Sequence, residues 1–280
     1  WLQKTKMGTA MALSDARVKN IIKTKKKQYN KLVGKRELTK VRAVISGDFD
    51  TYMKMSYVSQ YLDQIIVSMS SPLFVSRAKQ VKIWNDLCSQ CRNPNVVKFP
   101  FDQSAFDQHI SLEMVLSVIR YLRILLKRKN APKECLDVMD LVIYALDGGF
   151  LELTNGRLVK VEGGVLSGWR WTAMLDTMIN MIQFETWLLH VGKRQDMLSS
   201  QSKYFGDDIS LLLSSVDECV SYVEFMLDND YVVNPKKVFL SYHRTEFLRK
   251  LITQDGSIGY LGRSINSIFW RNPVSPDPVK

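Results

Sequence analysis

A short apolar hairpin with two acids at its turn is the feature that most constrains the fold of this chain. It runs from Lys203 to Leu211 and reads Lys-Tyr-Phe-Gly-Asp-Asp-Ile-Ser-Leu. Gly206 lets the backbone turn tightly, so Asp207 and Asp208 are presented at the tip between two strands. The chain is therefore expected to contain an antiparallel strand pair that carries carboxylates at one edge of its sheet.

A second carboxylate follows another predicted strand. Residues 96–102 are mostly apolar, and Asp102-Gln-Ser-Ala-Phe-Asp107 leads from that strand into a helix. If the two strands are neighbours, Asp102 and Asp207 meet at one edge of the sheet. Two carboxylates there can bind two divalent metals about 3.5–4 Å apart, and magnesium suits them because it prefers oxygen ligands. An acidic turn beside an unrelated helix cap is the alternative, which the tripeptide Gly-Asp-Asp alone does not exclude.

The rest of the chain alternates helices with strands linked by turns. Apolar residues at helical spacing predict helices over residues 52–68, 75–87, 110–127, 132–146, 170–191 and 216–228, and the first thirty residues look mostly helical. Extended segments are predicted over residues 32–46, 231–240 and 246–252, and a hairpin over residues 151–161 around Asn155-Gly156. This order predicts an α+β fold, an antiparallel sheet backed by helices.

Positive charge is concentrated near the start of the chain. The whole sequence has 39 Lys and Arg against 28 Asp and Glu, a formal net charge of +11. Ten basic residues and one acid lie between Lys19 and Arg42, a local charge of +9, which leaves +2 for the other 256 residues. Such a concentration makes a focused positive field suited to phosphates. A solvated basic helix or a tail that touches RNA non-specifically explains the same charge equally well.

Cysteine usage and hydropathy exclude other classes of protein. Four cysteines do not form a disulfide framework in 280 residues. Cys88 and Cys91 have the spacing of half a zinc site, but a structural zinc needs four ligands and the three histidines are scattered. We therefore expect reduced, intracellular cysteines. No apolar run approaches the length needed to span a bilayer, so no membrane partner is expected. Because the chain opens on Trp1 without a signal-type segment, we expect an excerpt of a longer, non-secreted polypeptide.

A polar stripe lies between the two acidic motifs. A glycine-rich loop ending in Ser167-Gly168 leads into a helix on which Thr172, Asp176 and Asn180 recur at i, i+4 and i+8. That spacing places the three side chains on one helical face. Beside a metal site they could hydrogen-bond a sugar hydroxyl. In isolation they are the solvent-facing residues of a capped helix.

The order of these motifs resembles that of the viral RNA-dependent RNA polymerases. The matching segments correspond to motifs F, A, B, C, D and E: Lys35-Arg-Glu-Leu-Thr-Lys40-Val-Arg42, Asp102-x4-Asp107, Ser167-Gly168-x3-Thr172 with Asn180, Gly206-Asp207-Asp208, Asn234-Pro-Lys236-Lys237, and Glu246-Phe-Leu-Arg249. The resemblance covers residues 19–263. The basic motif, the run Ser-Gly-Trp-Arg-x-Thr, and Glu-Phe-Leu-Arg followed by Gly-Tyr-Leu-Gly-Arg-Ser look most like the totivirus-like group of double-stranded RNA viruses. An ordered set is far more specific than any one motif.

The resemblance implies a right-hand polymerase architecture. Residues 1–95 would be a fingers-derived segment with motif F, residues 96–252 the palm with motifs A to E, and residues 253–280 the start of the connection to a largely missing thumb. The implied activity is template-directed RNA synthesis, with nucleotidyl transfer from NTPs to an RNA 3′-hydroxyl and two divalent metals, Mg²⁺ or alternatively Mn²⁺. The implied partners are RNA template and product, NTPs and viral capsid proteins, in the virion interior and the host cytoplasm.

The resemblance also implies which residues take part in the chemistry. Asp102 and Asp207 would hold the two metals, with Asp208 as a supporting acid. Lys237, or its neighbour Lys236, would be the general acid that protonates the leaving pyrophosphate.

Nucleotide binding is implied for two further sets of residues. Lys35, Lys40 and Arg42 would lie along the incoming triphosphate, where positive charge offsets the charge that develops on pyrophosphate. A second set would surround the ribose and select it through its 2′-hydroxyl: Asp107, Ser167, Gly168, Thr172 and Asn180.

One position departs from the family pattern. Four residues after Thr172 the family usually carries an asparagine that bonds the motif A acid, whereas this chain has Asp176. An anion close to Asp107 would repel it or share its proton. Either Asn180 takes over sugar recognition or Asp176 is turned away.

Two other classes share part of this pattern. A reverse transcriptase has the same palm and metal acids, but it usually carries an aromatic residue and a variable one before the paired acids, where this chain has Gly206. A non-catalytic RNA-binding module would need only the basic run and its phosphate contacts. Carboxylates at a sheet edge would repel RNA from such a module. The motifs therefore favour an enzyme that makes RNA.

Overall fold

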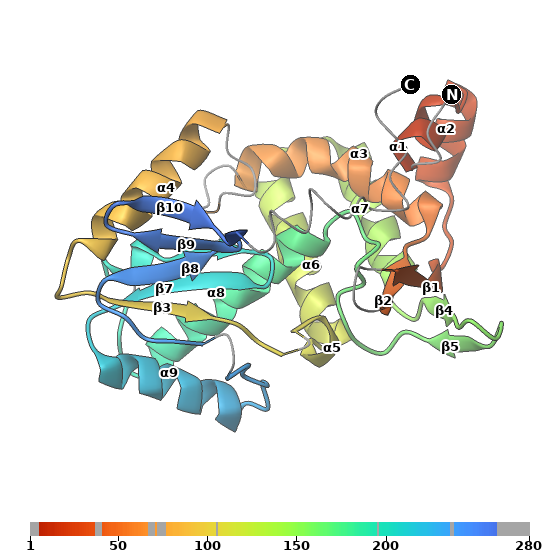
Figure 1. Cartoon of the computed structure of the whole chain (residues 1–280). Helices are drawn as coiled ribbons and strands as arrows, with labels where there is room; N and C mark the ends of the chain where they lie inside the picture. Colours follow the sequence, from red (N-terminus) through yellow and green to blue (C-terminus); the bar gives the residue numbers. More distant parts are fainter. Residues whose placement is uncertain are drawn as a thin grey trace, which may run out of the picture. The chain divides into compact units, whose positions relative to one another are not determined.

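The computed structural model describes residues 6–36, 41–66, 71, 77–104, 106–194, 196–235 and 238–261 (Figure 1). The chain divides into two compact units, each made of several segments. Unit 1 contains residues 1–33, 44–69 and 105–179, and unit 2 contains residues 34–43, 70–104 and 180–280. The predicted division into fingers, palm and thumb connection at residues 95 and 252 stays a prediction.

Unit 1 is mainly helical. Its helices are α1 (Lys6–Met11), α2 (Asp15–Lys23), α3 (Phe49–Ile66), α5 (Phe106–His109), α6 (Leu112–Arg128), α7 (Lys133–Leu146) and the first part of α8 (Thr172–His190). Ser111 begins α6 because its hydroxyl accepts a hydrogen bond from the Met114 N–H. Apolar residues recur along α6 at helical spacing and are buried. Helix α3 packs against α2, α6 and α7, so the apolar faces of these helices meet in the unit.

A four-stranded sheet has the order β2-β1-β4-β5. Its strands are β1 (Tyr29–Arg36), β2 (Val41–Ser46), β4 (Phe150–Glu152) and β5 (Leu158–Lys160). β1 runs parallel to β4, and β4 pairs antiparallel with β5. The predicted hairpin is confirmed, with Gly156 at φ +81° in its turn.

Unit 2 contains two antiparallel three-stranded sheets, of order β3-β7-β6 and β10-β9-β8. Their strands are β3 (Val97–Phe101), β6 (Lys203–Phe205), β7 (Asp208–Leu213), β8 (Arg244–Phe247), β9 (Lys250–Thr253) and β10 (Gly256–Gly259). Helix α4 (Arg77–Cys91) packs against β8, β9 and β10, and α9 (Val216–Asp228) packs against β7 (Figure 1). The short 3-10 helix η2 (Ser199–Gln201) precedes β6. Helices and antiparallel strands together confirm the predicted α+β class.

One tyrosine contacts three other aromatic rings in the core of unit 2. Tyr222 on α9 is fully buried, and three aromatic rings contact it edge-on. They come from Phe101 on β3 at 5.0 Å, and from Trp187 and Phe184 on α8 at 5.4 Å and 5.7 Å between centroids. Such edge-to-face pairs add to the free energy of apolar burial. They attach both helices to the sheet.

Two predicted strands are wrong in detail. Residues 231–240 contain no strand in their described part, only an isolated bridge between Val233 and Gln103. The predicted strand over residues 246–252 is a hairpin made of β8 and β9. Its turn residues, Leu248 and Arg249, have φ values of 49° and 61°, which are typical of the two-residue turns that join antiparallel strands.

The structure also bears on the excluded classes. All four cysteines are free, with Cys91, Cys135 and Cys219 buried. Among the described residues, no helix combines the length and the apolar character needed to cross a bilayer.

Candidate active site

The acids predicted from the sequence lie at one edge of the β3-β7-β6 sheet. β3 and β7 pair antiparallel, with Phe101 opposite Ile209. Asp102 is the next residue after β3, and Asp208 is the first residue of β7. One step beyond the last pair, the register therefore brings Asp102 level with Asp208 and beside the turn that carries Asp207. The expected neighbourhood of the two strands is confirmed.

The three carboxylates differ in exposure. Asp102 is 7% exposed, Asp208 is half-buried, and Asp207 is exposed at the turn. Gly206, which precedes Asp207 and Asp208, has φ +61°, a left-handed conformation that favours glycine. One acid is therefore buried at the strand end and another is exposed at the turn.

These acids fit an ion that is shared with a substrate. Within the described part of the chain, no three His, Cys, Asp or Glu side chains are arranged to hold a metal by themselves. Magnesium, however, is usually bound through one or two carboxylates together with waters and substrate phosphates. Asp102 and Asp207 supply such carboxylates at one edge. The donor set therefore suits magnesium that is bound with a phosphate ligand and not a preformed cage.

Asn234 supports Asp102 from a neighbouring segment. The Asn234 N–H donates to the Asp102 carbonyl oxygen at 2.9 Å, and Nδ2 donates to Oδ2 at 2.9 Å. The Ser104 N–H donates to the Val232 carbonyl at 2.7 Å, so the end of β3 is attached to residues 232–234. Sequence reasoning placed Asn234 in motif D but missed this contact. The one available signal was the following proline, which restricts Asn234 to extended backbone.

Asn180 does not have the expected environment. It lies in α8 with 0% exposure, and its side-chain amide bonds Gln103 and the Gly206 carbonyl. An exposed face for ribose is therefore lacking at this position. Gln103 and Gln183, which share the buried amide contacts, were not singled out from the sequence.

The loop of Ser167 and Gly168 belongs to unit 1 and contacts the end of β2. The Ser167 hydroxyl accepts a hydrogen bond from the Ile45 N–H at 3.1 Å, and the Gly168 carbonyl accepts one from Lys6 Nζ at 3.0 Å. The backbones of Gly47 and Gly168 approach so closely that a Cβ on Gly168 would lie 2.1 Å from the Gly47 nitrogen. These contacts hold the loop against the end of β2, the strand that contains Arg42.

Thr172 and Asp176 lie at the start of α8. The Thr172 hydroxyl contacts two carbonyl oxygens, of Leu166 at 2.7 Å and Trp169 at 3.1 Å, so it closes the turn that begins the helix. Asp176 is one turn further on and 5% exposed. The position of Thr172 is therefore set by the local structure of unit 1.

Several predicted residues fall outside what the structure describes. Lys40, Lys236 and Lys237 lie outside the described residues. Lys35 and Arg42 are in strands β1 and β2, and Asp107 is in α5, but their side chains are likewise outside the description. Their roles stay predictions.

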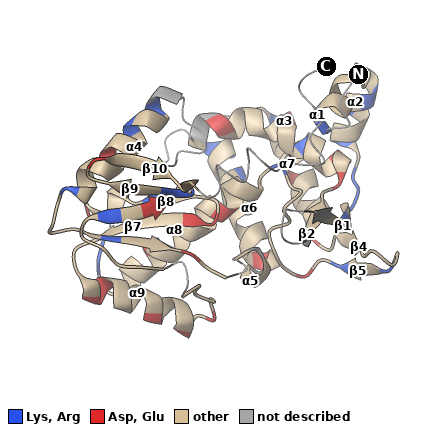
Figure 2. Cartoon of the chain, in the orientation of Figure 1, with Lys and Arg blue, Asp and Glu red and all other residues tan. Residues whose placement is uncertain are grey.

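Part of the basic segment is bound within unit 1. Lys27 Nζ donates to the Tyr144 carbonyl at 3.0 Å and lies 3.9 Å from the Tyr144 ring centroid. Lys31 pairs with Glu152 at 2.9 Å, which raises the pKa of the lysine and lowers that of the carboxyl. Figure 2 shows the basic residues of this region on α2 and β1. The local charge of +9 is thus partly structural and only partly available to phosphates.

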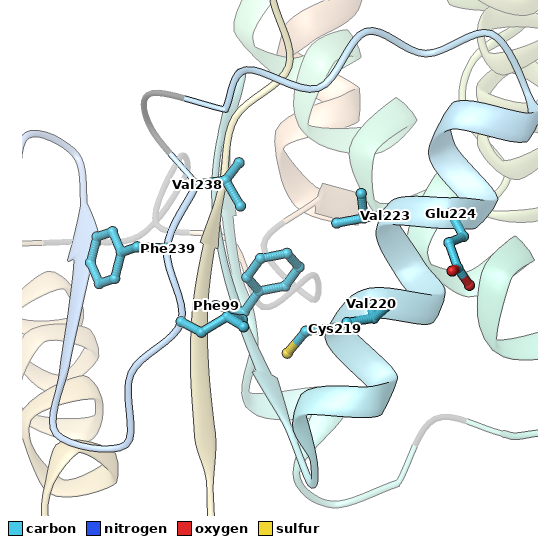
Figure 3. A pocket seen from close by; sticks show the side chains of 8 residues that line it. Phe99, Cys219, Val220, Val223, Glu224, Val238 and Phe239 are labelled. Carbon is cyan, nitrogen blue, oxygen red and sulfur yellow. The ribbon is translucent and has the colours of Figure 1, made fainter.

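A separate pocket of about 430 Å³ lies between α9, β3 and residues 238–240 (Figure 3). Its lining is largely apolar and includes Phe99, Val223 and Val238. Glu224 is the charged residue among the described residues that line it. Burial raises the pKa of the Cys219 thiol to about 12. Such a lining offers little to a phosphate, so the pocket is distinct in chemistry from the acidic edge.

Sequence comparison finds similar proteins among viral polymerases. A family model described as viral RNA-directed RNA-polymerase matches residues 6–269. The probable RNA-directed RNA polymerase of Giardia lamblia virus (isolate Wang) is 30% identical over 252 residues, which are 87% of this chain and 13% of that protein. The probable RNA-directed RNA polymerase of Helminthosporium victoriae virus-190S is 26% identical over 155 residues, 55% of this chain and 18% of that protein. The chain spans less than a fifth of the length of each of these relatives.

Structural comparison agrees at the level of the fold. The crystal structure of the RNA-dependent RNA polymerase of a human picorbirnavirus has a TM-score of 0.71 at 16% identity, covering 98% of this chain and 59% of that one. The in situ structure of BmCPV RNA-dependent RNA polymerase at elongation state has a TM-score of 0.58 at 14% identity, covering 91% and 23%.

Proposed function

Because the chain belongs to the viral RNA-directed RNA-polymerase family, we propose that it carries the catalytic centre for template-directed RNA synthesis. The predicted resemblance to totivirus-like polymerases of double-stranded RNA viruses is confirmed, and so is the expected polymerase fold. In the proposed reaction an RNA 3′-oxygen forms a bond to the α-phosphorus of an NTP and loses its proton. The bond from that phosphorus to pyrophosphate breaks. The observation that carries the proposal is the β3–β7 register, which brings Asp102 beside the Asp207-Asp208 turn.

The proposed metal ligands are the two carboxylates at the sheet edge. Asp102 and Asp207 would hold divalent ions, Mg²⁺ or Mn²⁺, with Asp208 as a supporting acid. When bound, such ions make the 3′-hydroxyl a better nucleophile and offset the negative charge on the phosphates. The chain itself contributes rigidity at the base, where Asn234 holds Asp102, and access at the tip, where Asp207 is exposed.

Contacts with the nucleotide are proposed for three groups of residues, which would bind the triphosphate, the leaving pyrophosphate and the ribose. Lys35, Lys40 and Arg42 would offset charge on the triphosphate, and Lys237 or Lys236 would protonate the leaving pyrophosphate. Recognition of the 2′-hydroxyl is proposed for a group that excludes Asn180: Asp107, Ser167, Gly168 and Thr172. Since the Ser167 and Thr172 hydroxyls already bond backbone groups, they would contact a sugar with their remaining lone pairs.

Partners and location follow from the proposed activity. RNA template, RNA product and NTPs are the proposed substrates, and viral capsid proteins are proposed partners in the virion interior and the host cytoplasm. The viral origin of the relatives supports this setting.

Incorporation of labelled nucleotides by the full-length parent protein tests the proposal. Single-stranded RNA and DNA templates would be supplied with ribo- or deoxyribonucleotides, in Mg²⁺ and in Mn²⁺. We expect ribonucleotide incorporation on RNA. Deoxyribonucleotide incorporation would instead indicate a reverse transcriptase. Tight, salt-sensitive RNA binding without incorporation would indicate a non-catalytic binding module.

A further inference from the structure

Three amide side chains are buried beside the acidic edge of unit 2. Asn180 and Gln183 are on α8, one turn apart, with exposures of 0% and 3%. Gln103 follows Asp102 directly and is 6% exposed. A buried amide that lacks a partner costs about 1–3 kcal/mol, so buried amides are normally matched to specific groups. Their partners therefore show what they hold in place.

The hydrogen bonds of Asn180 join two segments that carry acids. Nδ2 of Asn180 donates to the Gly206 carbonyl at 2.7 Å, and Oδ1 accepts from Gln103 Nε2 at 2.9 Å. Gln103 Nε2 also donates to Gln183 Oε1 at 2.8 Å. Because the Gly206 carbonyl can only accept, it determines which end of the Asn180 amide faces it. The opposite end then faces Gln103, so the two contacts require each other.

The side-chain hydrogen bonds from Gly206 through Asn180 to Gln103 form a bridge, and this bridge begins where the pairing of β3 with β7 stops. The β3–β7 pairing ends at Phe101 and Ile209, one residue before Asp102 and two residues after Asp207. Asn180 bonds Gly206, the residue that precedes Asp207. It also bonds Gln103, the residue that follows Asp102. The separation of Asp102 and Asp207 thus depends on side-chain amides as well as on the backbone hydrogen bonds between β3 and β7.

We propose that Asn180 is a positioning residue that fixes the Gly206-Asp207-Asp208 turn relative to the strand end that carries Asp102, with Gln103 as its partner. The role differs from the sugar contact expected from the sequence, since the Asn180 amide is buried and engaged. The catalytic consequence rests on the proposed polymerase function. The structural part, a turn held by Asn180, does not.

Two variants of the full-length parent separate these contacts. Asn180→Asp keeps an acceptor for Gln103 but loses the donor to the Gly206 carbonyl, and Asn180→Leu removes both at similar volume. Thr186→Val is the control, because it removes an exposed hydroxyl on the same helix, which donates to the Ile182 carbonyl one turn earlier. Backbone hydrogen exchange over residues 102–104 and 205–209 reports the structural effect in each protein.

We expect faster exchange at both segments in the two Asn180 variants and not in Thr186→Val. We also expect kcat to fall by about 10- to 100-fold, the range typical of residues that support metal ligands. KM for the nucleotide and the preference for ribonucleotides over deoxyribonucleotides should change by less than about twofold, because ground-state binding and sugar contacts are untouched. A general loss of folding would instead lower the active fraction and accelerate exchange throughout both units.

Other outcomes contradict the proposal. An altered preference for ribonucleotides with wild-type hydrogen exchange would indicate that Asn180 contacts the sugar. Unchanged exchange and unchanged kcat would remove its positioning role. If Asn180→Leu does not fold, Gln103→Leu, Asn180→Asp and their double variant still test the contact. The double variant should then be no worse than the poorer single one, because both break the same bridge. If the wild-type parent incorporates no nucleotide, the proposed function fails, while hydrogen exchange still decides the structural role.

Discussion

Asn234 donates two hydrogen bonds to Asp102, from its backbone N–H to the carbonyl oxygen and from Nδ2 to Oδ2, both at 2.9 Å. Pro235 follows and restricts Asn234 to extended backbone. Backbone and side-chain donors of one residue therefore meet backbone and side-chain acceptors of the other. Asn234 sets both where the chain leaves β3 and which way the first carboxylate of the site points.

Asn234→Ala should remove a hydrogen bond that orients the Asp102 carboxylate. We expect nucleotide incorporation to fall by about 10- to 100-fold, as is typical when a residue that orients a metal ligand is removed. The Mg²⁺ concentration for half-maximal rate should rise. Asn95→Ala is the control, because Asn95 is exposed in the same unit. Wild-type magnesium dependence in Asn234→Ala would show that Asp102 needs no such support.

Gly168→Ala should destabilise the protein. Its new Cβ would lie 2.1 Å from the Gly47 nitrogen and 2.2 Å from the Ile45 carbonyl oxygen, so backbone has to move. Overpacking of this kind costs about 1–3 kcal/mol in the free energy of unfolding, which urea denaturation measures. Gly259→Ala should be nearly neutral, since no described residue beyond its chain neighbours places an atom within 4 Å of the added Cβ. Equal stability of the two variants would argue against the close approach of Gly47 and Gly168.

Thiol reagents should modify Cys88 first. Burial raises the pKa of Cys91 and Cys135 to about 11, and that of Cys219 to about 12. The thiolate is the reactive form, so at pH 8 only about one in a thousand thiols of pKa 11 is ionised. Cys88 also has a raised pKa, but it is the least buried of the four.

Mass spectrometry after brief labelling of the native protein checks this order. The rate at Cys88 should rise with pH as its thiolate fraction grows, and Cys88→Ser should abolish the early adduct. Early labelling of Cys135 or Cys219 in the native protein would contradict the burial described.

Asp176→Asn should leave ribose selectivity unchanged within about twofold. Asp176 is 5% exposed in unit 1, and we adopt the alternative in which it is turned away from the sugar. Competition between ribo- and deoxyribonucleotides on an RNA template measures the selectivity. Asp107→Ala is the comparison, because Asp107 is the proposed sugar contact and its loss should lower selectivity. A large change in Asp176→Asn would place Asp176 at the ribose.

The turn that carries Asp207 and Asp208 was predictable because its signals are local. A glycine before paired acids predicts a tight turn, and apolar residues on both sides predict the strands. Helix α6 was equally predictable, since its capping serine and its apolar spacing lie within one segment. Such features depend on neighbours in sequence.

The contacts of Asn180 and the turn of β8–β9 were not predictable in the same way. Helical spacing places Asn180 on a face of α8, but its partners Gln103 and Gly206 are 77 and 26 residues away. Leu248 and Arg249 lack the Asn-Gly pattern that signals a two-residue turn, so the hairpin looked like one strand. Tertiary contacts decide both cases.

The most direct test of the central claim is nucleotide incorporation by Asp207→Asn in the full-length parent, measured together with RNA affinity. Asp255→Asn is the matched control, because Asp255 is also an exposed acid in a hairpin turn of unit 2. The account predicts that Asp207→Asn abolishes incorporation and binds RNA nearly as the wild type does, while Asp255→Asn keeps both activities. Wild-type incorporation by Asp207→Asn would contradict a catalytic centre at this edge, and an equal loss of RNA binding would make Asp207 a structural residue.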